Sequence, residues 1–187
     1  MEDGRIQKTI QSKTGVRKLY KEFSEQWGAR IDLCFMLQDW DDPYNVGGLF
    51  RVADACGASE MILTGKTPCP PDPQIHVTSM GHHRRVKWSY EKHHEDAAIK
   101  IKEKGYSLVT VEIAEGALPY FEFEWPQKTC LVLGNESTGI YKSVMKHRDA
   151  AVYIPQFGKG RSLNVHVSAS VVAFHALLVG KQEIILP

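Results

Sequence analysis

Short apolar runs alternate along the chain with stretches in which apolar residues recur at helical spacing. Apolar runs of about four to eight residues are typical of buried strands, whereas apolar positions three and four residues apart are typical of helices. We therefore expect strands at 31–37, 60–64, 86–90, 107–112, 129–133 and 151–154. Helices are expected at 46–56, at about 93–104, after Ser137, and from Ser162 to Leu178. This alternation predicts an α/β fold built on a mainly parallel sheet flanked by helices.

The beginning of the chain has a different pattern. Residues 5–27 have the pattern of one amphipathic basic helix, which is broken by Gly15 or begins just after it and ends at Gly28. We therefore expect a basic N-terminal arm over 1–30 and one domain over 31–187, since no repeat or linker divides the rest. The proline-rich stretch 67–73 is expected to be a loop.

The composition is that of an ordinary globular protein. The chain has 187 residues, of which 43% are hydrophobic and 24% charged, so it is long enough to bury a core without disulfides or metals. Its four cysteines (Cys34, Cys56, Cys69 and Cys130) form no CxxC pair, as expected of reduced thiols in the cytoplasm. No stretch approaches the roughly 20 apolar residues of a membrane span, and the first residues lack the apolar segment of a secretion signal. We expect a cytoplasmic protein with no membrane partner.

Basic residues gather in two places, although the formal net charge is only +1. One cluster lies in the arm, and the other, at 82–87, is not interrupted by any acid. Both clusters suit the phosphates of a nucleic acid, and solvated surface charge is the alternative for any single residue. The candidates for nucleic-acid contact are Arg5, Lys8, Arg17, Lys18, His82, His83, Arg84 and Arg85.

A glycine-rich helix start lies at 41–58. Asn45 follows Asp-Asp-Pro-Tyr and is expected to cap the helix. Because helical side chains lean toward the N-terminus, Arg51 is expected to lie over the turn that holds Gly47 and Gly48. Two glycines in a first turn cost about 1 kcal/mol each relative to alanine, and they would leave an open floor for a phosphate or ribose beside the helix N-terminus. A surface arginine on a weak helix is the alternative.

Two further loops follow predicted strands. The strand at 129–133 runs into Gly-Asn-Glu-Ser-Thr-Gly, and the strand at 151–154 runs into Pro-Gln-Phe-Gly-Lys-Gly. Ligands of α/β folds bind at the carboxyl ends of strands, so both loops are candidate ligand sites. The first loop matches neither GxxxxGK[ST] nor GxGxxG, and Glu136 has the alternative role of capping the next helix.

The helix expected after Ser162 is apolar on two sides, which predicts burial between layers or against a partner subunit. Its polar residues gather at the N-terminal end, which predicts a site there. One apolar stripe is Leu163, Val167, Val171, Phe174 and Leu178; the other is Val165, Ala169, Val172, Ala176 and Val179; the polar group is Ser162, Asn164, His166 and Ser168.

Three segments in this order resemble the motifs of the SPOUT superfamily, specifically its TrmH (SpoU) branch. They are Asn-Val-Gly-Gly-Leu-Phe-Arg at 45–51, Leu-Gly-Asn-Glu-Ser-Thr-Gly at 133–139, and Ile-Pro-Gln-Phe-Gly-Lys-Gly-Arg-Ser-Leu-Asn-Val-x-Val at 154–167, where x is any residue. The resemblance covers about 31–180. It implies a C-terminal deep trefoil knot, a feature otherwise nearly absent from proteins, and a homodimer with the knot at its interface. It also implies transfer of a methyl group from S-adenosylmethionine, held in the knot, to a ribose 2′-hydroxyl of RNA.

The positions of these motifs imply the site residues. Catalytic roles fall on Asn45, Arg51, Glu136, Ser162 and Asn164. Because a guanidinium has a pKa above about 12 and stays protonated in proteins, we expect Arg51 to clamp a phosphate and stabilise the developing 2′-alkoxide. The implied cofactor contacts are Leu133, Gly134, Asn135, Glu136, Ile154, Gln156, Ser162 and Leu163.

No metal site is expected, because the pairs His82-His83 and His93-His94 have no cysteine or carboxylate at ligand spacing. The run 79–88 and the third motif are similar to tRNA ribose methylases that modify a D-loop guanosine, so tRNA is favoured and ribosomal RNA stays open. A catalytically silent RNA-binding SPOUT module is the main alternative, against which the intact motif residues count. A nucleotide-binding oxidoreductase would need a glycine-rich turn where the chain has Asp-Asp-Pro-Tyr at 41–44.

Overall fold

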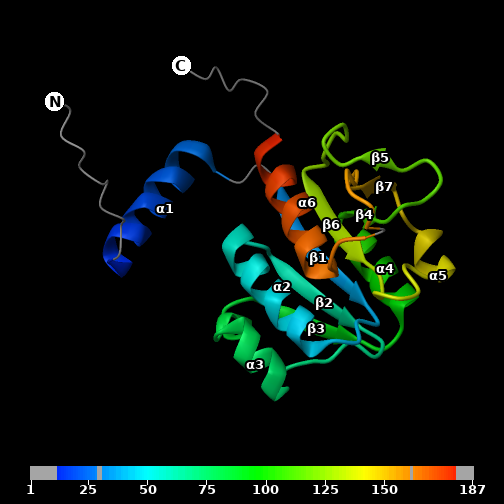
Figure 1. Ribbon diagram of the computed structural model, residues 1–187, viewed down its shortest axis with the longest axis horizontal. Helices are drawn as coiled ribbons and strands as arrows, with labels where there is room; N and C mark the ends of the chain where they lie inside the picture. Colours follow the sequence, from blue (N-terminus) through cyan, green and yellow to red (C-terminus); the bar gives the residue numbers. More distant parts are fainter. Residues whose placement is uncertain (1–11, 29–30, 161, 180–187) are drawn as a thin grey trace.

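The computed structural model describes residues 12–28, 31–160 and 162–179 (Figure 1). A 7-stranded sheet has the order β3-β2-β1-β6-β4-β7-β5, and all its neighbouring strands pair in parallel. The parallel α/β fold expected from the sequence is confirmed. The strands are β1 (Asp32–Gln38), β2 (Glu60–Thr64), β3 (Trp88–Glu91), β4 (Ser107–Val111), β5 (Leu118–Pro119), β6 (Lys128–Leu133) and β7 (Ala150–Tyr153). The helices are α1 (Lys13–Trp27), α2 (Pro43–Cys56), α3 (Pro73–Ser79), the 3₁₀ turn η1 (His82–Arg84), α4 (His94–Glu103), α5 (Lys142–Met145) and α6 (Val165–Val179).

The central strands β1, β2 and β6 each contain a continuous apolar run because helices cover both faces of the sheet. Successive side chains of a strand point to opposite faces, so Leu33, Phe35 and Leu37 of β1 join one core while Cys34 and Met36 join the other. Helices α2, α3 and α6 contribute to the first core, and α4 and α5 to the second. Figure 1 shows these two helical layers, with α1 set apart from the sheet.

The parallel arrangement brings distant segments to one edge. β1 and β6 are neighbours in the sheet although most of the chain's strands lie between them in sequence. Because parallel strands end at the same edge, the loops that follow β1, β4, β6 and β7 converge there, together with the start of α6.

The first turn of α2 differs from its prediction. The helix begins at Pro43, and the N-cap is Asp42, whose carboxylate accepts a hydrogen bond from the Tyr44 N–H. The assignment of Asn45 as the cap is therefore wrong, because an aspartate followed by a proline at the first helical position is the stronger start. Asn45 is instead buried inside the first turn.

Other boundaries also move. α6 begins at Val165 rather than Ser162, since Asn164 precedes it and accepts a hydrogen bond from the His166 N–H. α1 begins before Gly15, and the Ser12 side chain accepts a hydrogen bond from the Gly15 N–H, so the expected break or start at Gly15 is wrong. The expected end of this helix at Gly28 is confirmed. The sequence did not predict α3 or the short strand β5. Arg5 and Lys8 lie outside the described residues.

The glycine pair of α2 does not leave an open floor. A Cβ on Gly47 would lie 1.9 Å from Thr78 Oγ1 and 2.9 Å from the Ile75 carbonyl oxygen, and a Cβ on Gly48 would lie 3.0 Å from the His166 ring. The glycines are therefore needed so that α3 and α6 can approach α2 closely.

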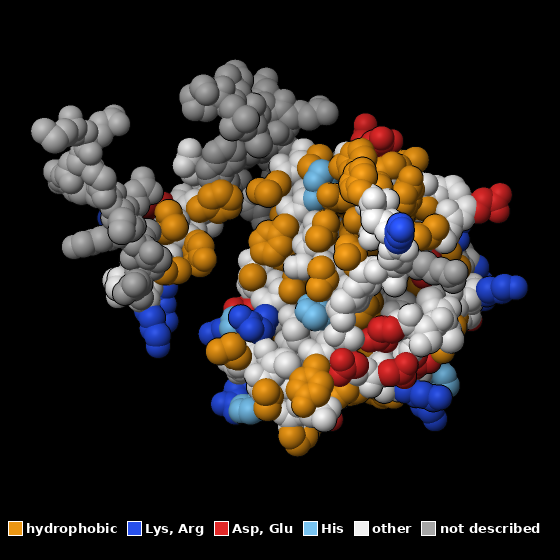
Figure 2. All heavy atoms as spheres, in the orientation of Figure 1, with side chains coloured by type: hydrophobic (Ala, Val, Ile, Leu, Met, Phe, Trp, Pro, Cys, Tyr) orange, Lys and Arg blue, Asp and Glu red, His pale blue; other side chains and the backbone are white. Residues whose placement is uncertain are grey.

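The two apolar stripes of α6 have different surroundings. Val172 and Ala176 are completely buried in the first core. The other stripe stays exposed in the single chain, and Figure 2 shows a row of hydrophobic side chains along α6. Its members are Leu163, Val167, Val171, Phe174 and Leu178, which are 36–49% exposed. Among the helices that the structure describes, none combines the length and apolar character needed to cross a membrane.

Candidate functional site

A cavity of about 510 Å³ opens at the carboxyl edge of the sheet. Its walls come from the ends of β4, β6 and β7 and from the start of α6. The structure brings together here all of the expected cofactor contacts. They are Leu133, Gly134, Asn135, Glu136, Ile154, Gln156, Ser162 and Leu163.

The lining of this cavity combines acidic and other polar residues with apolar ones. Glu112 and Glu136 contribute carboxylates, whereas Val111, Leu133 and Ile154 contribute apolar surface. No lysine or arginine is found among the described residues that line it. The volume lies in the usual range of about 300–1,000 Å³ for small-molecule sites. A lining with two carboxylates and an apolar surface therefore suits a cationic nucleoside such as S-adenosylmethionine better than a polyphosphate.

The loop after β6 is held in one conformation. Asn135 and Gly139 form an antiparallel bridge, and Asn135 Oδ1 accepts hydrogen bonds from the backbone N–H groups of Ser137 and Thr138. A Cβ on Gly134 would lie 2.4 Å from the Gly139 carbonyl carbon, and Gly139 has φ +67°. The spacing of glycines in this motif thus follows from a tight loop closed on itself.

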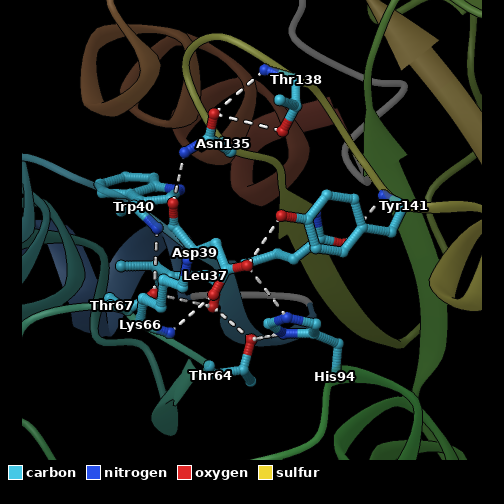
Figure 3. A network of polar contacts seen from close by, with 12 residues as sticks. Leu37, Asp39, Trp40, Thr64, Lys66, Thr67, His94, Asn135, Thr138 and Tyr141 are labelled. Carbon is cyan, nitrogen blue, oxygen red and sulfur yellow. Dashed lines mark hydrogen bonds and ion pairs between the residues drawn. The ribbon is translucent and has the colours of Figure 1, made fainter.

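A network around Asp39 supports that loop from below (Figure 3). Asp39 Oδ1 accepts a hydrogen bond of 2.6 Å from the Lys66 N–H, and Oδ2 lies 2.8 Å from the Tyr141 hydroxyl oxygen and 3.2 Å from His94 Nε2. The Asp39 carbonyl oxygen accepts a bond from Asn135 Nδ2. One residue therefore ties the end of β1 to three other segments and to the cofactor loop.

Asp39 has an unusual backbone and a perturbed carboxyl group. Its φ is +49°, a region that few residues other than glycine adopt without local support. Burial alone would raise its pKa, but the bonds from Lys66 and Tyr141 and the nearby His94 outweigh burial and lower the pKa. The hydrogen bond that Tyr141 donates to Asp39 raises the pKa of the Tyr141 hydroxyl, and burial raises it further. The sequence prediction missed this network, and its only signal was an aspartate at the end of a buried strand.

Asn45 joins the three sequence motifs. Its Nδ2 donates a hydrogen bond of 2.9 Å to Glu136 Oε1, and its Oδ1 accepts a bond of 3.0 Å from Asn164 Nδ2. His166 Nδ1 lies 3.1 Å from the same oxygen. Asn45, Glu136 and Asn164 were all expected in the site, whereas His166 was expected only as one of the polar residues at the start of the last helix, without a role of its own.

Arg51 lies outside the first cavity. It lines a second, more open groove of about 690 Å³ between α2, α3, η1 and α6, together with Gly48, His82 and His166. Asn45 lines this groove and Asn164 lines the cavity, so the hydrogen bond between the two amides stands at the boundary of the two spaces. The side chain of Arg51 is exposed.

The candidate nucleic-acid residues differ in their exposure and in whether an acid lies close to their charge. His82 Nδ1 and Arg85 Nη2 lie 2.8 Å and 3.2 Å from Asp54 Oδ2, an acid that the sequence run did not reveal. His83 is half-buried against Ser79, and burial, with the nearby His76 and Arg84, lowers its pKa. Arg17, Lys18, Arg84 and Arg85 are exposed, and Lys18 Nζ lies 3.7 Å from Glu22 Oε1. Within the described ranges, no group of histidine, cysteine and acidic side chains could hold a metal ion.

These features define an α/β enzyme domain with a nucleoside-sized cavity at the carboxyl edge of a parallel sheet. The model of the SpoU rRNA Methylase family matches residues 32–174. The chain belongs to this family, and the resemblance to the TrmH (SpoU) branch is confirmed.

Relatives and solved structures of named function agree with this membership. The chain is 31% identical over 148 residues to a tRNA (guanosine(18)-2′-O)-methyltransferase of Thermus thermophilus, covering 78% of this chain and 74% of the relative. It is 27% identical over 134 residues to the 23S rRNA (guanosine(2553)-2′-O)-methyltransferase RlmP of Bacillus subtilis, covering 72% of this chain and 53% of that relative. The SpoU methyltransferase AviRb of Streptomyces viridochromogenes, solved in complex with AdoMet, superposes with a TM-score of 0.73 at 25% identity and covers 79% of this chain and 57% of that one.

Proposed function

We propose that this chain transfers the methyl group of S-adenosylmethionine to a ribose 2′-hydroxyl of RNA. The observation that carries the proposal is the acidic, nucleoside-sized cavity, which the Asn45–Asn164 hydrogen bond connects to a groove containing Arg51. When bound, S-adenosylmethionine supplies an electrophilic methyl group on a sulfonium centre. Glu112 and Glu136 would favour this cation, and the apolar wall near Leu133 and Ile154 would hold an adenine.

The groove residues would hold the RNA. Arg51 is exposed in a groove large enough for a nucleotide, and its planar guanidinium suits a phosphate next to the reacting ribose. We assign Arg51 to holding that phosphate and stabilising negative charge on the 2′-oxygen. Asn45, Ser162 and Asn164 would position the ribose and the cofactor, and Glu136 orients the Asn45 amide.

Transfer RNA is the favoured substrate. The Thermus thermophilus relative, which the chain matches over most of both lengths, is named for guanosine 18 of tRNA, whereas RlmP is named for 23S rRNA. The exposed Arg17 and Lys18 of α1 and Arg84 of η1 would contact RNA phosphates. In this proposal the arm over 1–30 is an RNA-binding extension of a methyltransferase domain over 31–187.

The exposed stripe of α6 supports a homodimer. Val167, Val171, Phe174 and Leu178 form one apolar face of α6 beside the Arg51 groove, and Leu163 lies just before the helix. Val167 and Phe174 belong to both the stripe and the groove lining. A second copy of the chain is the occupant that we propose for this stripe. Val171→Asp should therefore convert a dimer into a monomer by light scattering at micromolar concentration, while the exposed Ile99→Asp on α4 should not. A wild-type monomer would contradict the proposal.

Two further features belong to the same proposal. We propose that the segment between β7 and α6 passes through a loop of the chain to form a trefoil knot, which the family membership supports. We also propose a cytoplasmic, reducing compartment, since Cys34, Cys56, Cys69 and Cys130 are all free thiols.

The test uses an unmodified tRNA transcript with guanosine at position 18 and S-adenosylmethionine labelled in its methyl group. Wild type should methylate the 2′-hydroxyl in a single turnover. Arg51→Ala should lower the rate by about 10²–10³-fold with nearly unchanged cofactor affinity, because the guanidinium acts on the transition state. Arg51→Lys should restore little, since an ammonium lacks the planar fork.

Arg148→Ala is the matched control, because Arg148 follows α5 and lies outside both spaces. A folded wild type that binds no S-adenosylmethionine by calorimetry would refute the proposal. Binding without transfer to tRNA or 23S rRNA transcripts would favour the silent RNA-binding alternative.

A further inference from the structure

His166 combines four properties that the proposed function leaves unused. It lies in the first turn of α6, it lines the Arg51 groove, its Nδ1 is bound to Asn45, and its ring covers Gly48. The reaction needs a group that accepts the 2′-hydroxyl proton, and a guanidinium cannot serve because it stays protonated. The inference about His166 rests on the proposed function.

The hydrogen bonds around Asn45 determine which ring nitrogen of His166 carries the proton. An ionised carboxylate only accepts hydrogen bonds, so the Asn45 atom that faces Glu136 must be the NH₂ group. The atom that faces His166 is therefore the carbonyl oxygen, which can only accept. Asn164 also donates to this oxygen, since its own Oδ1 is occupied by the His166 backbone N–H. His166 Nδ1 must consequently carry a hydrogen.

The other ring nitrogen is then available as a base. In a neutral imidazole with hydrogen on Nδ1, the lone pair lies on Nε2. Within the part of the chain that the structure describes, Nε2 makes no hydrogen bond, and the residue borders the groove in which Arg51 lies. Burial lowers the pKa of His166, while Asp42 acts in the opposite direction, so the ring is neutral at pH 7 and above.

The position of the ring is built into the fold. A Cβ on Gly48 would lie 3.0 Å from His166 Cδ2 and 3.2 Å from Nε2, so a larger residue at 48 would displace the imidazole. His82, the other histidine that lines the groove, has its Nδ1 2.8 Å from an Asp54 oxygen. His166 is the better placed of the two to act on a ribose held between Arg51 and Asn45.

We propose that His166 is the general base of the reaction. Its Nε2 accepts the proton of the ribose 2′-hydroxyl while the 2′-oxygen forms a bond to the methyl carbon. The bond between methyl carbon and sulfur breaks with its electron pair staying on sulfur, and the imidazolium later releases its proton to water. Arg51 remains a phosphate and alkoxide contact in this scheme.

The first test reads the ring itself and needs no activity. Long-range ¹H–¹⁵N correlation spectra of protein labelled at histidine, assigned by comparison with His166→Asn, should show a neutral His166 with hydrogen on Nδ1 at pH 7.5. Protonation should follow a pKa below the ordinary value of about 6.5. Hydrogen on Nε2 instead of Nδ1 would overturn the inference, whatever the activity.

The second test separates a base from a positioning residue. His166→Asn keeps an NH₂ group that can donate to Asn45 Oδ1 but has no basic nitrogen. Single-turnover methylation of the tRNA transcript by wild type should rise with pH and reach a plateau above the His166 pKa. The variant should be slower by about 10²–10⁴-fold at pH 7.5, the range for a lost general base, and its rate should rise without that plateau.

The charged and titratable groups that face His166 also influence the pH profile. They are Asp42, Tyr44 and Arg51 of α2 and its cap, His82 of η1, and Glu136 through Asn45. His175→Asn is the matched control on the same helix, because its ring packs on Tyr120 outside the groove, and it should keep the wild-type profile.

The outcomes are distinct. An active wild type with a His166→Asn variant within twofold of it, or with a slower variant that keeps the wild-type pH profile, would overturn the inference alone. A wild type that binds S-adenosylmethionine but methylates no RNA would overturn the proposed function and the inference with it. Unchanged cofactor affinity in His166→Asn, measured by calorimetry, is expected if the ring acts only on the hydroxyl.

Discussion

Replacing Asp39 with asparagine tests whether the network below the cofactor loop holds the site together. The Asp39 side chain is only 11% exposed, and its carboxylate is faced by three donors, from Lys66, Tyr141 and His94. An asparagine keeps one acceptor oxygen and turns its NH₂ toward at least one of these donors. Because hydrogen bonds to charged groups contribute about 1.5–3 kcal/mol and a buried unsatisfied donor costs about 1–3 kcal/mol, Asp39→Asn should lower the free energy of unfolding by about 2–4 kcal/mol at pH 7.

The difference between wild type and variant should depend on pH. The pKa of Asp39 is lower in the folded protein than its ordinary value of 3.8. A group of this kind contributes stability above its unfolded pKa, and the contribution is lost as the pH falls through the folded pKa. Urea unfolding should therefore show a constant difference from about pH 5 to 8 that narrows below about pH 4.

Two controls sharpen this experiment. Asp72→Asn makes the same chemical change at the cap of α3, where asparagine caps about as well as aspartate, so it should cost less than about 0.5 kcal/mol. Tyr141→Phe removes one donor and should cost about 1 kcal/mol in wild type but little when combined with Asp39→Asn. A loss below about 1 kcal/mol for Asp39→Asn, or a difference that acid leaves unchanged, would refute the network as a support of the loop.

Three further predictions concern packing, burial and charge. Gly47→Ala should lower the free energy of urea unfolding by about 1–3 kcal/mol, because the added Cβ would meet the Ile75 carbonyl of α3. This loss should appear although alanine favours helix by about 1 kcal/mol relative to glycine. A variant more stable than wild type would contradict the close approach of α3 to α2. The His175 Nε2 is buried without a partner among the described residues, and burial lowers its pKa, so wild type should lose stability as the pH falls below about 6.5. His175→Leu should lose less, and equal slopes in the two proteins would count against this assignment. Glu112→Gln should weaken binding of S-adenosylmethionine by about 1 kcal/mol or less. Parallel calorimetric titrations should show a smaller loss of affinity for the demethylated product, whose sulfur carries no charge. Equal losses for the two compounds would argue that the cavity does not prefer the cation.

The sequence predicted the fold from local pattern and the cavity from strand ends. A buried parallel strand has a continuous apolar run, so β1, β2 and β6 could be located within a residue or two. Because parallel strands end at one edge, the loops after them had to meet, which is why the expected cofactor contacts do line one cavity. The motif resemblance added the order and the chemistry.

Contacts between distant residues could not be predicted in this way. The glycines of α2 were explained by an empty floor, since nothing local reveals that Thr78 and His166 fill it. Asn45 looked like a helix cap because caps are recognised by local residue type, but its three partners come from segments around 136 and 164–166. Asp39 likewise has partners from four other segments. These positions depend on topology, which periodicity does not encode.

The hydrogen bonds of Asn45 affect how late in its synthesis the chain can complete its cofactor and RNA site. Its partners Glu136, Asn164 and His166 lie 91, 119 and 121 residues further along, and contacts of such long sequence separation tend to form slowly. A ribosome-bound chain that ends before residue 164 has the β1–α2 segment and the glycine-rich loop but neither donor for the Asn45 carbonyl. Cofactor retention would thus mature only after α6 has been synthesised and docked. Methyl transfer would then serve as a sensitive measure of complete folding, lost in trapped or truncated chains that still contain most of the sheet.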